Sequence, residues 1–489
     1  MARDAETGTT SEAEPDQTLR VHALFRVPDL DGALGSVGKV ERRETRSMTE
    51  VYHDTEGLRL FRWGVTLRRR EGGAEEGWQL LLPVLGAEEC PRDEVRAPLA
   101  AGRVGAVPHA LHDIVTSLVR EAPLVPVAIL RTERTPYLLF DTDGEPAVEL
   151  VDDTVSILDG EHVAARFREL AVHRVGGSSG TVLPDVVGLL LEEGAVPGTV
   201  SKAASALGPR ASAPPDVVER PAVCPDDPAA AAVRAHISLQ VYRFLMQDVR
   251  VRRDLPDSVH QMRVAARRLR SGLKVFGPLL DAEWSVGLRA ELGWAAGELG
   301  RVRDTEVMLS RLDDHADELP PSDAQLATDV VERVLKAELA RAREHALASM
   351  RSQRHIDLLV ALVDAVHHPL LTELANEACR DVLPPMVAKS FHRLERDVRL
   401  LHIDSPAEPW HETRIAGKRA RYAAELVAPV FGDPARRLAK ALAQVTENLG
   451  DHQDCHVAQQ ELRRIAQRDD VDAATGFALG LLHAAEEER

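Results

Sequence analysis

Cysteine, lysine and aromatic residues are scarce in this sequence of 489 residues, and long apolar runs are missing. The four cysteines, at positions 90, 224, 379 and 455, have no CxxC spacing. This scatter excludes a disulfide framework and a zinc module of the usual spacing, so we expect reduced, inert thiols. No stretch approaches the roughly 20 apolar residues that a membrane span needs. We therefore expect no membrane association.

The first residues, MARDAETGTTSEAEPDQ, are polar and mostly acidic. They contain no positive segment followed by an apolar run, which a secretory signal peptide would need. We expect residues 1–17 to form a disordered acidic tail, and we expect the protein to be cytoplasmic.

Only seven of the 60 basic residues are lysines, and the others are arginines. The planar guanidinium group of arginine holds phosphate oxygens in pairs. A coding bias toward arginine would give the same ratio, so the positions of these residues must decide their role. The formal net charge is −18, and an overall acidic protein repels a long nucleic acid duplex.

A stretch rich in proline, alanine and serine, residues 208–230, separates two regions of different texture. Before it, short apolar runs alternate with hairpin-type turns such as EGG and DTDGE, which predicts antiparallel strands. Helical pieces are expected near 108–120 and 183–193. After it, apolar residues recur at helical spacing. We predict an α+β protein: a barrel domain over 18–208, a linker over 209–222, and an all-α domain over 223–489.

The predicted helical domain contains an internal repeat. The segment VHQMRVAARRLRSGLKVFGPLL begins at Val259, and WHETRIAGKRARYAAELVAPVF begins at Trp410. The alignment pairs His260 with His411, Arg263 with Arg414, Arg267 with Lys418, Arg268 with Arg419, and Arg270 with Arg421. Further along, LGRVRD (299–304) aligns with LGDHQD (449–454). Two such copies predict a two-repeat helical bundle with pseudo-two-fold symmetry.

Each copy places its basic residues on one face. At about 100° per residue, the basic side chains of the first copy fall in a stripe about 80° wide, formed by His260, Arg263, Arg267, Arg270 and Lys274. The second copy gives the same stripe from His411, Arg414, Lys418 and Arg421, with Glu425 where the first has Lys274. A solvated charged face usually mixes signs, whereas like charges at i,i+3 and i,i+4 destabilise a helix unless an anion offsets them.

A repeating polyanion such as inorganic polyphosphate fits two parallel stripes. Nucleic acid fits less well, because its binding sites usually add aromatic stacking platforms, and aromatic residues are 4% of this chain. Metal binding remains an alternative at His452 and His456 beside Cys455, although no third convincing ligand is found. Phosphohistidine chemistry is a further alternative, without an adjacent acid or base to support it.

With its two stripes and the LGDHQD segment, the helical region from about Cys224 onward resembles the CHAD family, the conserved-histidine α-helical domain. The resemblance implies a helical module that binds polyphosphate and is often associated with polyphosphate granules. The implied binding residues are His260, Arg263, Arg267, Arg268, Arg270, Lys274, His411, Arg414, Lys418, Arg419 and Arg421.

The region over 18–208 resembles the CYTH family, the triphosphate-tunnel metalloenzymes. The resemblance rests on residues 51–84 and 131–155, on FREL (167–170) and on SKAASAL (201–207). It implies a closed antiparallel barrel whose interior binds a triphosphate and a divalent metal, with Arg68, Arg70, Arg131 and Arg134 among the anion-binding residues.

Several positions depart from that family. Its first strand carries an ExExK motif, where this chain has Arg20, His22 and Leu24. Leu81 replaces an expected lysine, and Ala171 and His173 replace late glutamates. The remaining acids are Glu149, Asp152, Asp153 and Glu169. Because metal-assisted hydrolysis needs carboxylates to hold the metal, we predict an inactive domain without catalytic residues, metal or cofactor. The alternative is a metal-dependent triphosphatase that uses Mg²⁺ or Mn²⁺, with the helical domain delivering substrate.

Overall fold

The computed structural model describes residues 16–73, 75–84, 92–175, 181–218, 222–402 and 406–487, except the side chains at 407, 447–454, 456 and 487. Most of the expected acidic tail, and the side chains of His452 and His456, lie outside this description. The chain forms two compact units, Met1–Asp216 and Val217–Arg489. The division falls inside the segment that we expected to be a linker.

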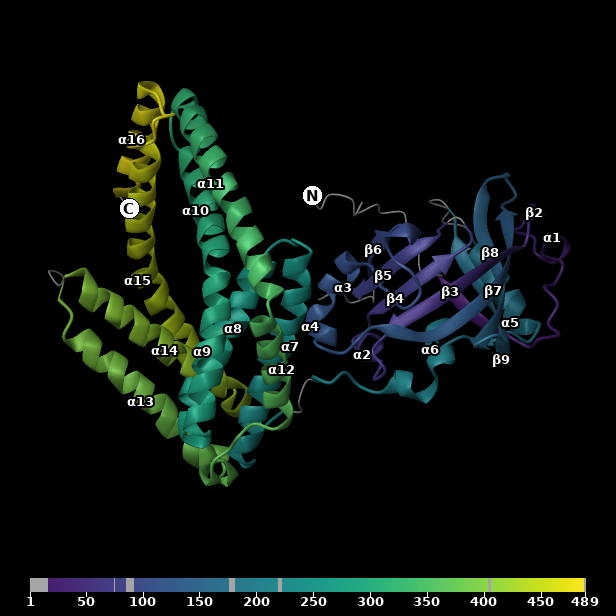
Figure 1. Ribbon diagram of the computed structural model, residues 1–489, viewed down its shortest axis with the longest axis horizontal. Coiled ribbons are helices and arrows are strands. Elements are labelled where there is room, and N and C mark those ends of the chain that lie inside the picture. Colours follow the sequence, from purple (N-terminus) through teal and green to yellow (C-terminus); the bar gives the residue numbers. More distant parts are fainter. Residues whose placement is uncertain are drawn as a thin grey trace. The chain divides into compact units, whose positions relative to one another are not determined.

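The first unit is built on one antiparallel sheet of ten strands (Figure 1). The strands follow the order β10-β1-β9-β8-β7-β3-β4-β5-β6, and β2 pairs with β7. Their bounds are β1 Gln17–Val21, β2 Lys39–Arg42, β3 Arg46–Asp54, β4 Thr66–Glu71, β5 Gly77–Pro83, β6 Arg92–Ala97, β7 Val125–Phe140, β8 Pro146–Asp159, β9 His162–Arg174 and β10 Val196–Pro197.

The expected closed barrel is wrong in one respect, because the sheet is open. Within the described ranges no pairing joins β6 to β10. β1 has five residues and β10 has two, so this edge offers too little backbone to continue a hydrogen-bonded ladder around to β6.

Short helices cover this sheet: α1 Leu30–Ala33, α2 Arg59–Arg62, α3 His109–Ile114, α4 Thr116–Val119, α5 Val182–Glu192 and α6 Lys202–Leu207, with 3₁₀ turns η1 Leu99–Ala101 and η2 Gly208–Ser212. The helical pieces predicted near 108–120 and 183–193 are confirmed. Helix α5 packs Val186 and Leu190 against Leu19 and Val172 of the sheet. The opposite face of the sheet carries polar side chains and forms the cavity described below.

The second unit is all-helical, as predicted. Its helices are α7 Ala229–Arg252, α8 Ser258–Val275, α9 Ala282–Glu298, α10 Gly300–Ala316, α11 Pro321–Met350, α12 Gln353–His367, α13 Cys379–Arg399, α14 Ala407–Phe431, α15 Asp433–Ala466 and α16 Ala473–Glu487, with 3₁₀ turns η3 Gly277–Leu279 and η4 Glu373–Asn376. In the part of the chain that the structure describes, no helix has the length and apolar character needed to cross a membrane.

The sequence repeat corresponds to a structural one. Helices α7, α8 and α9 contact one another in succession, as do α13, α14 and α15, and the two striped helices α8 and α14 are themselves in contact. The copies differ after the stripe, because Leu299 separates α9 from α10 while α15 runs on through the equivalent segment. The apolar sides of the stripes point inward, with Met262 and Leu269 of α8 and Ala416 and Ala420 of α14 buried.

Candidate functional sites: a cavity on the sheet and a basic track on the helices

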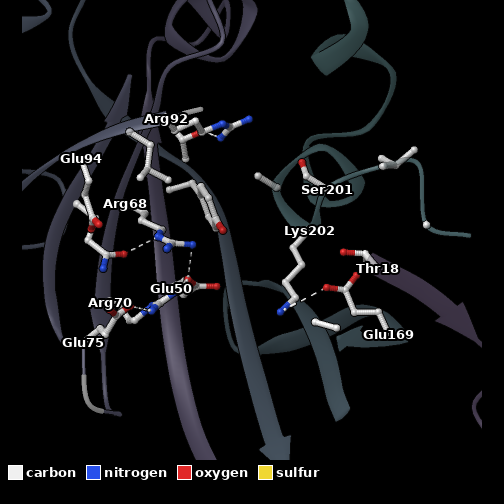
Figure 2. A pocket seen from close by; sticks show the side chains of 18 of the residues that line it. Thr18, Glu50, Arg68, Arg70, Glu75, Arg92, Glu94, Glu169, Ser201 and Lys202 are labelled. Carbon is white, nitrogen blue, oxygen red and sulfur yellow. Dashed lines mark hydrogen bonds and ion pairs between the residues drawn. The ribbon is translucent and has the colours of Figure 1, made fainter. Parts of the chain in front are cut away.

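The polar face of the sheet encloses a cavity of about 680 Å³, which we call the sheet cavity (Figure 2). Alternate residues of neighbouring strands point into it, because side chains in a strand alternate between its two faces. Among its lining residues, the charged ones are Glu50, Arg68, Arg70, Glu75, Arg92, Glu94, Arg134, Glu169 and Lys202. Both signs of charge therefore meet in one enclosed space.

Glu50 is the most buried acid of one wall. Its Oε1 lies 2.9 Å from Arg68 Nη1 and 3.0 Å from Arg70 Nη2. Burial alone would raise the pKa of Glu50, but Arg68 and Arg70 outweigh it and hold this pKa below its usual range. Arg70 also pairs with Glu75 at 3.0 Å, and Arg68 donates to Gln79 at 2.7 Å. These cations are thus held in a network of ion pairs and hydrogen bonds.

Lys202 lies on the facing wall of the cavity and is also paired with acids (Figure 2). It stands at the first position of α6, where the Ser201 hydroxyl caps the helix by accepting a hydrogen bond from Ala204 N. Its Nζ lies 3.4 Å from Glu169 and forms a short ion pair with Asp153. Arg20 Nε approaches the other oxygen of Glu169 at 3.5 Å. Glu169 is therefore held between two cations, one of them at a position where we expected a glutamate in the related enzymes.

Asp153 receives two parallel hydrogen bonds of 2.9 Å from Arg134. Burial raises the pKa of Asp153, but Lys202 and Arg134 together hold it below its usual value. Asp153 is fully buried. A bidentate arginine–carboxylate pair of this kind is strong and fixes the orientation of both groups.

The structure brings three of the four arginines predicted for this region, Arg68, Arg70 and Arg134, into the sheet cavity. The placement of Arg131 there is wrong. Arg131 is exposed and does not line the cavity. It lies three residues before Arg134 in β7, so the two side chains point to opposite faces of the strand.

The structure also locates the residues that depart from the enzyme pattern. Leu81, Ala171 and His173 line the sheet cavity, so lysine and glutamates are replaced on its inner surface. His22 and Leu24 follow the end of β1 and are exposed. Of the remaining acids, Asp152 is bound to Arg168, and Glu149 does not line the cavity.

The residues of the sheet cavity do not fit a divalent metal. Glu50, Glu75, Glu94 and Glu169 are each within ion-pair distance of an arginine or lysine. Carboxylates that hold Mg²⁺ or Mn²⁺ must offer their oxygens to the ion. Over the described residues, no cluster of three or more His, Cys, Asp and Glu side chains is arranged to hold a metal.

The helical unit has a different arrangement, which we call the basic track: His260, Arg263, Arg267, Arg270 and Lys274 of α8, with Arg289 of α9, Arg303 of α10, Arg393 of α13 and Arg419 of α14. At one end, Arg263 donates to Ala296 O at 2.9 Å and lies 3.7 Å from Asp304. Burial, Arg303, Arg267 and Arg263 together lower the pKa of His260, against a weaker opposite effect of Asp257.

At the other end, cations from four helices meet. Burial lowers the pKa of Lys274, and so do the charges of Arg419, Arg289, Arg393 and Arg270. Burial, Arg393 and Arg289 likewise lower the pKa of Arg419, opposed by Asp397. Burial and the neighbouring arginines therefore both disfavour the positive charges of Lys274 and Arg419.

The second stripe is partly neutralised. Glu425 binds Arg421 at 2.8 Å and lies 3.8 Å from Arg268. The guanidinium groups of Arg267 and Arg421 each lie 5.6 Å from the ring centre of Tyr422, within cation–π range. Of the other predicted residues, His411 is exposed, and Arg414 and Lys418 are half-buried.

Several residues of these sites were not found from the sequence. Glu50 and Lys202 of the sheet cavity were missed, although Lys202 is the second residue of the SKAASAL segment. Arg303 was missed although it lies in the LGRVRD segment. Arg289 and Arg393 carry no local signal, because only the packing of α9 and α13 brings them to Lys274.

Comparisons with known proteins agree with this two-part organisation. Residues 235–463 match the CHAD domain family. Over 514 aligned residues the chain is 33% identical to an uncharacterized protein of Mycobacterium tuberculosis, found in strains CDC 1551 and H37Rv, and the alignment covers 96% of this chain and 93% of the relative. The helical unit therefore contains a CHAD domain, and the whole chain belongs to the same family as this mycobacterial protein.

Solved structures similar to parts of the chain include PptA from Streptomyces chartreusis, with 26% identity, a TM-score of 0.45 and coverage of 54% of this chain and 95% of PptA. The CHAD domain of the plant Ricinus communis is 27% identical with a TM-score of 0.45, and the match covers 57% of this chain and 93% of that domain. The N-terminal part matches HpAC1 from Hippeastrum, a protein described as having a dominant triphosphatase activity. The identity is 18% and the TM-score 0.24, and the match covers 40% of this chain and 97% of HpAC1. The resemblance of the helical region to the CHAD family is confirmed by the family match over 235–463.

Proposed function

We propose that the protein binds inorganic polyphosphate along the basic track. The observation that carries this proposal is the gathering of cations from four helices around Lys274 of α8, where burial and the charges of Arg289 and Arg393 lower the pKa of both Lys274 and Arg419. Like charges held together destabilise the free protein, and an anion between them would remove that repulsion. Arginine forks suit the oxygens of a phosphate chain.

The shape and composition of the track favour polyphosphate over nucleic acid. Its cations run along α8 for several turns, which suits a repeating ligand with a charge on each unit. Tyr422 is the aromatic side chain beside these cations, and Arg267 and Arg421 approach its ring. Proteins that hold single-stranded nucleic acid use free aromatic faces on which bases stack. The CHAD domain of the helical unit supports the same ligand.

The test is isothermal titration of long-chain polyphosphate into the full chain. The double variant Lys274→Glu with Arg419→Glu places acids where the cations meet, and we expect at least a hundredfold loss of affinity. A second double variant, Arg267→Glu with Arg421→Glu, should abolish binding while the helical circular dichroism signal stays unchanged. The control is Lys336→Glu, an exposed lysine of α11 that pairs with Glu332. Normal binding by both double variants would contradict the proposal.

We also propose that the sheet cavity binds a compact anion only weakly and does not hydrolyse a phosphate, because Arg68, Arg70 and Lys202 already pair with carboxylates of the cavity. Its carboxylates are engaged by cations, which leaves them poorly suited to hold a metal for hydrolysis. The competing function is a metal-dependent triphosphatase. Phosphate release from tripolyphosphate or ATP, measured with and without Mg²⁺ or Mn²⁺, separates the two, because metal-dependent release well above the blank would favour the enzyme.

We further propose a cytoplasmic location at polyphosphate granules, which follows from the proposed ligand. Fluorescence microscopy of the tagged full chain in cells that accumulate polyphosphate tests this location. The Lys274→Glu with Arg419→Glu variant should become diffuse, whereas Lys336→Glu should still mark granules.

A further inference from the structure

A second cavity lies within the helical unit, between the two copies of the repeat. Its volume is about 560 Å³, in the range of pockets that hold small organic ligands. We call it the helical cavity, and its walls come from α7, α8, α14 and α15. Leu239, Leu426 and Val430 give it apolar walls, together with several alanines.

Gln240 of α7 lines this cavity and is 4% exposed. Its amide oxygen is buried and has no hydrogen-bond partner among the described residues. An unpaired buried polar group costs about 1–3 kcal/mol of folding free energy, and native proteins rarely leave one without a reason. A ligand that donates a hydrogen bond to this oxygen supplies that reason.

His236, one turn earlier, presents a neutral ring to the same cavity. Burial lowers the pKa of His236 to about 4, so the ring is uncharged at neutral pH. Its Nε2 lies 3.2 Å from Arg268 O, and because a carbonyl oxygen only accepts, Nε2 carries the proton and Nδ1 is an acceptor. A Cβ at Gly272 would lie 2.2 Å from this Nε2. Glycine at 272 is therefore required for the ring to occupy this place.

Cationic groups complete the lining. Arg268 and Arg436 line the cavity, and their carboxylate neighbours are Glu425 at 3.8 Å and Asp433 at 3.1 Å, respectively. The cavity thus combines apolar walls, a buried amide, a neutral imidazole and arginines. Its occupant must present a flat or compact apolar body with hydrogen-bonding edges and also an anionic group.

We propose that the helical cavity binds an adenine nucleotide. A glutamine amide can both accept from the N6 amine and donate to N7 of adenine, which is the pairing that proteins use to recognise this base. The base would lie between Leu239, Leu426 and Val430, and the phosphate would meet Arg268 and Arg436. This proposal does not depend on polyphosphate binding, although Arg268 is also one of the residues that the family resemblance implies for it.

The experiment is titration of the full chain with AMP, and then with GMP and tripolyphosphate as competitors. We expect AMP to bind at least tenfold more tightly than GMP and not to be displaced by tripolyphosphate. Gln240→Leu should weaken AMP binding at least tenfold while the melting temperature is maintained or raised, because the variant removes an unpaired buried amide. Polyphosphate binding by this variant should be unchanged.

Ala235→Phe provides an independent check, because Ala235 lines the cavity and a larger side chain there would occupy its space. This variant should also lose AMP binding. The proposal is overturned if AMP fails to bind at millimolar concentration, if Gln240→Leu binds AMP normally, or if GMP binds as tightly as AMP. Displacement of AMP by tripolyphosphate would also overturn it, since the nucleotide would then be held by its phosphate alone.

Discussion

The sheet cavity and the basic track both gather arginine and lysine, but they treat these charges in opposite ways. Glu50 in the sheet cavity and the buried Asp153 beside it are enclosed by cations at hydrogen-bonding distance. On the basic track, burial and the charges of neighbouring arginines lower the pKa of both Lys274 and Arg419. In the first arrangement the charges are compensated within the folded unit, whereas in the second the cations repel one another, and we propose that a bound anion relieves this repulsion. A count of basic residues would not distinguish the two sites, because they differ in the groups that lie next to those residues.

The largest expected effect comes from removing the charge of a fully buried acid beside the sheet cavity. Asp153→Asn would leave Arg134 and Lys202 close together without their common counter-charge. Breaking a buried ion pair in this way costs about 3–5 kcal/mol. Urea unfolding of the N-terminal unit, followed by circular dichroism, should show a loss of that size. Glu161→Gln, an exposed position in the turn between β8 and β9, is the matched control, and an equal effect of both variants would contradict the comparison.

Raising the salt concentration should separate the two sites next. Binding along the basic track releases counterions, so polyphosphate affinity should fall at least tenfold between about 50 and 200 mM salt. The ion pairs of the sheet cavity are buried and screened less, so the stability of the N-terminal unit should change little. Titration and urea unfolding at both salt concentrations measure these effects. Salt-independent polyphosphate binding would be inconsistent with the track.

A smaller effect is expected from pH. The pKa of His260 is lowered in the free protein, so its ring is neutral at pH 7.5, and a bound polyanion favours the protonated form. Binding therefore takes up a proton, and affinity should rise about threefold between pH 7.5 and 5.5. His260→Gln should remove most of this dependence. If the variant retains the full pH dependence, His260 is not in contact with the ligand.

The smallest expected effect is a gain of stability, whereas Asp153→Asn causes a loss. Lys274→Gln removes one of several mutually repelling cations, and we expect the free protein to gain about 0.5 kcal/mol of stability. The gain should disappear when polyphosphate is present, because the wild-type lysine then has an anionic partner. Thermal unfolding with and without polyphosphate tests both points. A loss of stability in the free protein would show that Lys274 is compensated by groups other than a ligand.

The sequence was sufficient to predict the parts that follow from periodicity. The stripe of α8 and its repeat in α14 are helices with buried apolar sides, as the 3.6-residue spacing indicated. The error at Arg131 was avoidable, because Arg131 and Arg134 are three residues apart and cannot share a face of a regular strand. The alternation of side chains along a strand assigns Arg131 and Arg134 to opposite faces of the sheet.

Other features depend on packing that the sequence does not display. Arg289 and Arg393 reach Lys274 through the placement of α9 and α13, and neither belongs to the repeated segments. The open edge of the sheet follows from the short β1 and β10, whose lengths could not be read from the family pattern. The partners of Glu169 come from β1 and α6, far apart in the sequence, so its neutralisation could be seen only after folding.

The stripe of basic residues on α8 has a defined length. From His260 to Lys274 it covers 15 residues of a continuous helix, and its ends are about 21 Å apart at the usual rise per residue. Within that span the cations repeat at helical spacing, so a longer polymer offers many overlapping registers. A polymer bound in this way can slide, and several copies of the protein can load onto one strand. Occupancy would then be counted per unit length of polymer, and affinity should grow with chain length even after the track is filled.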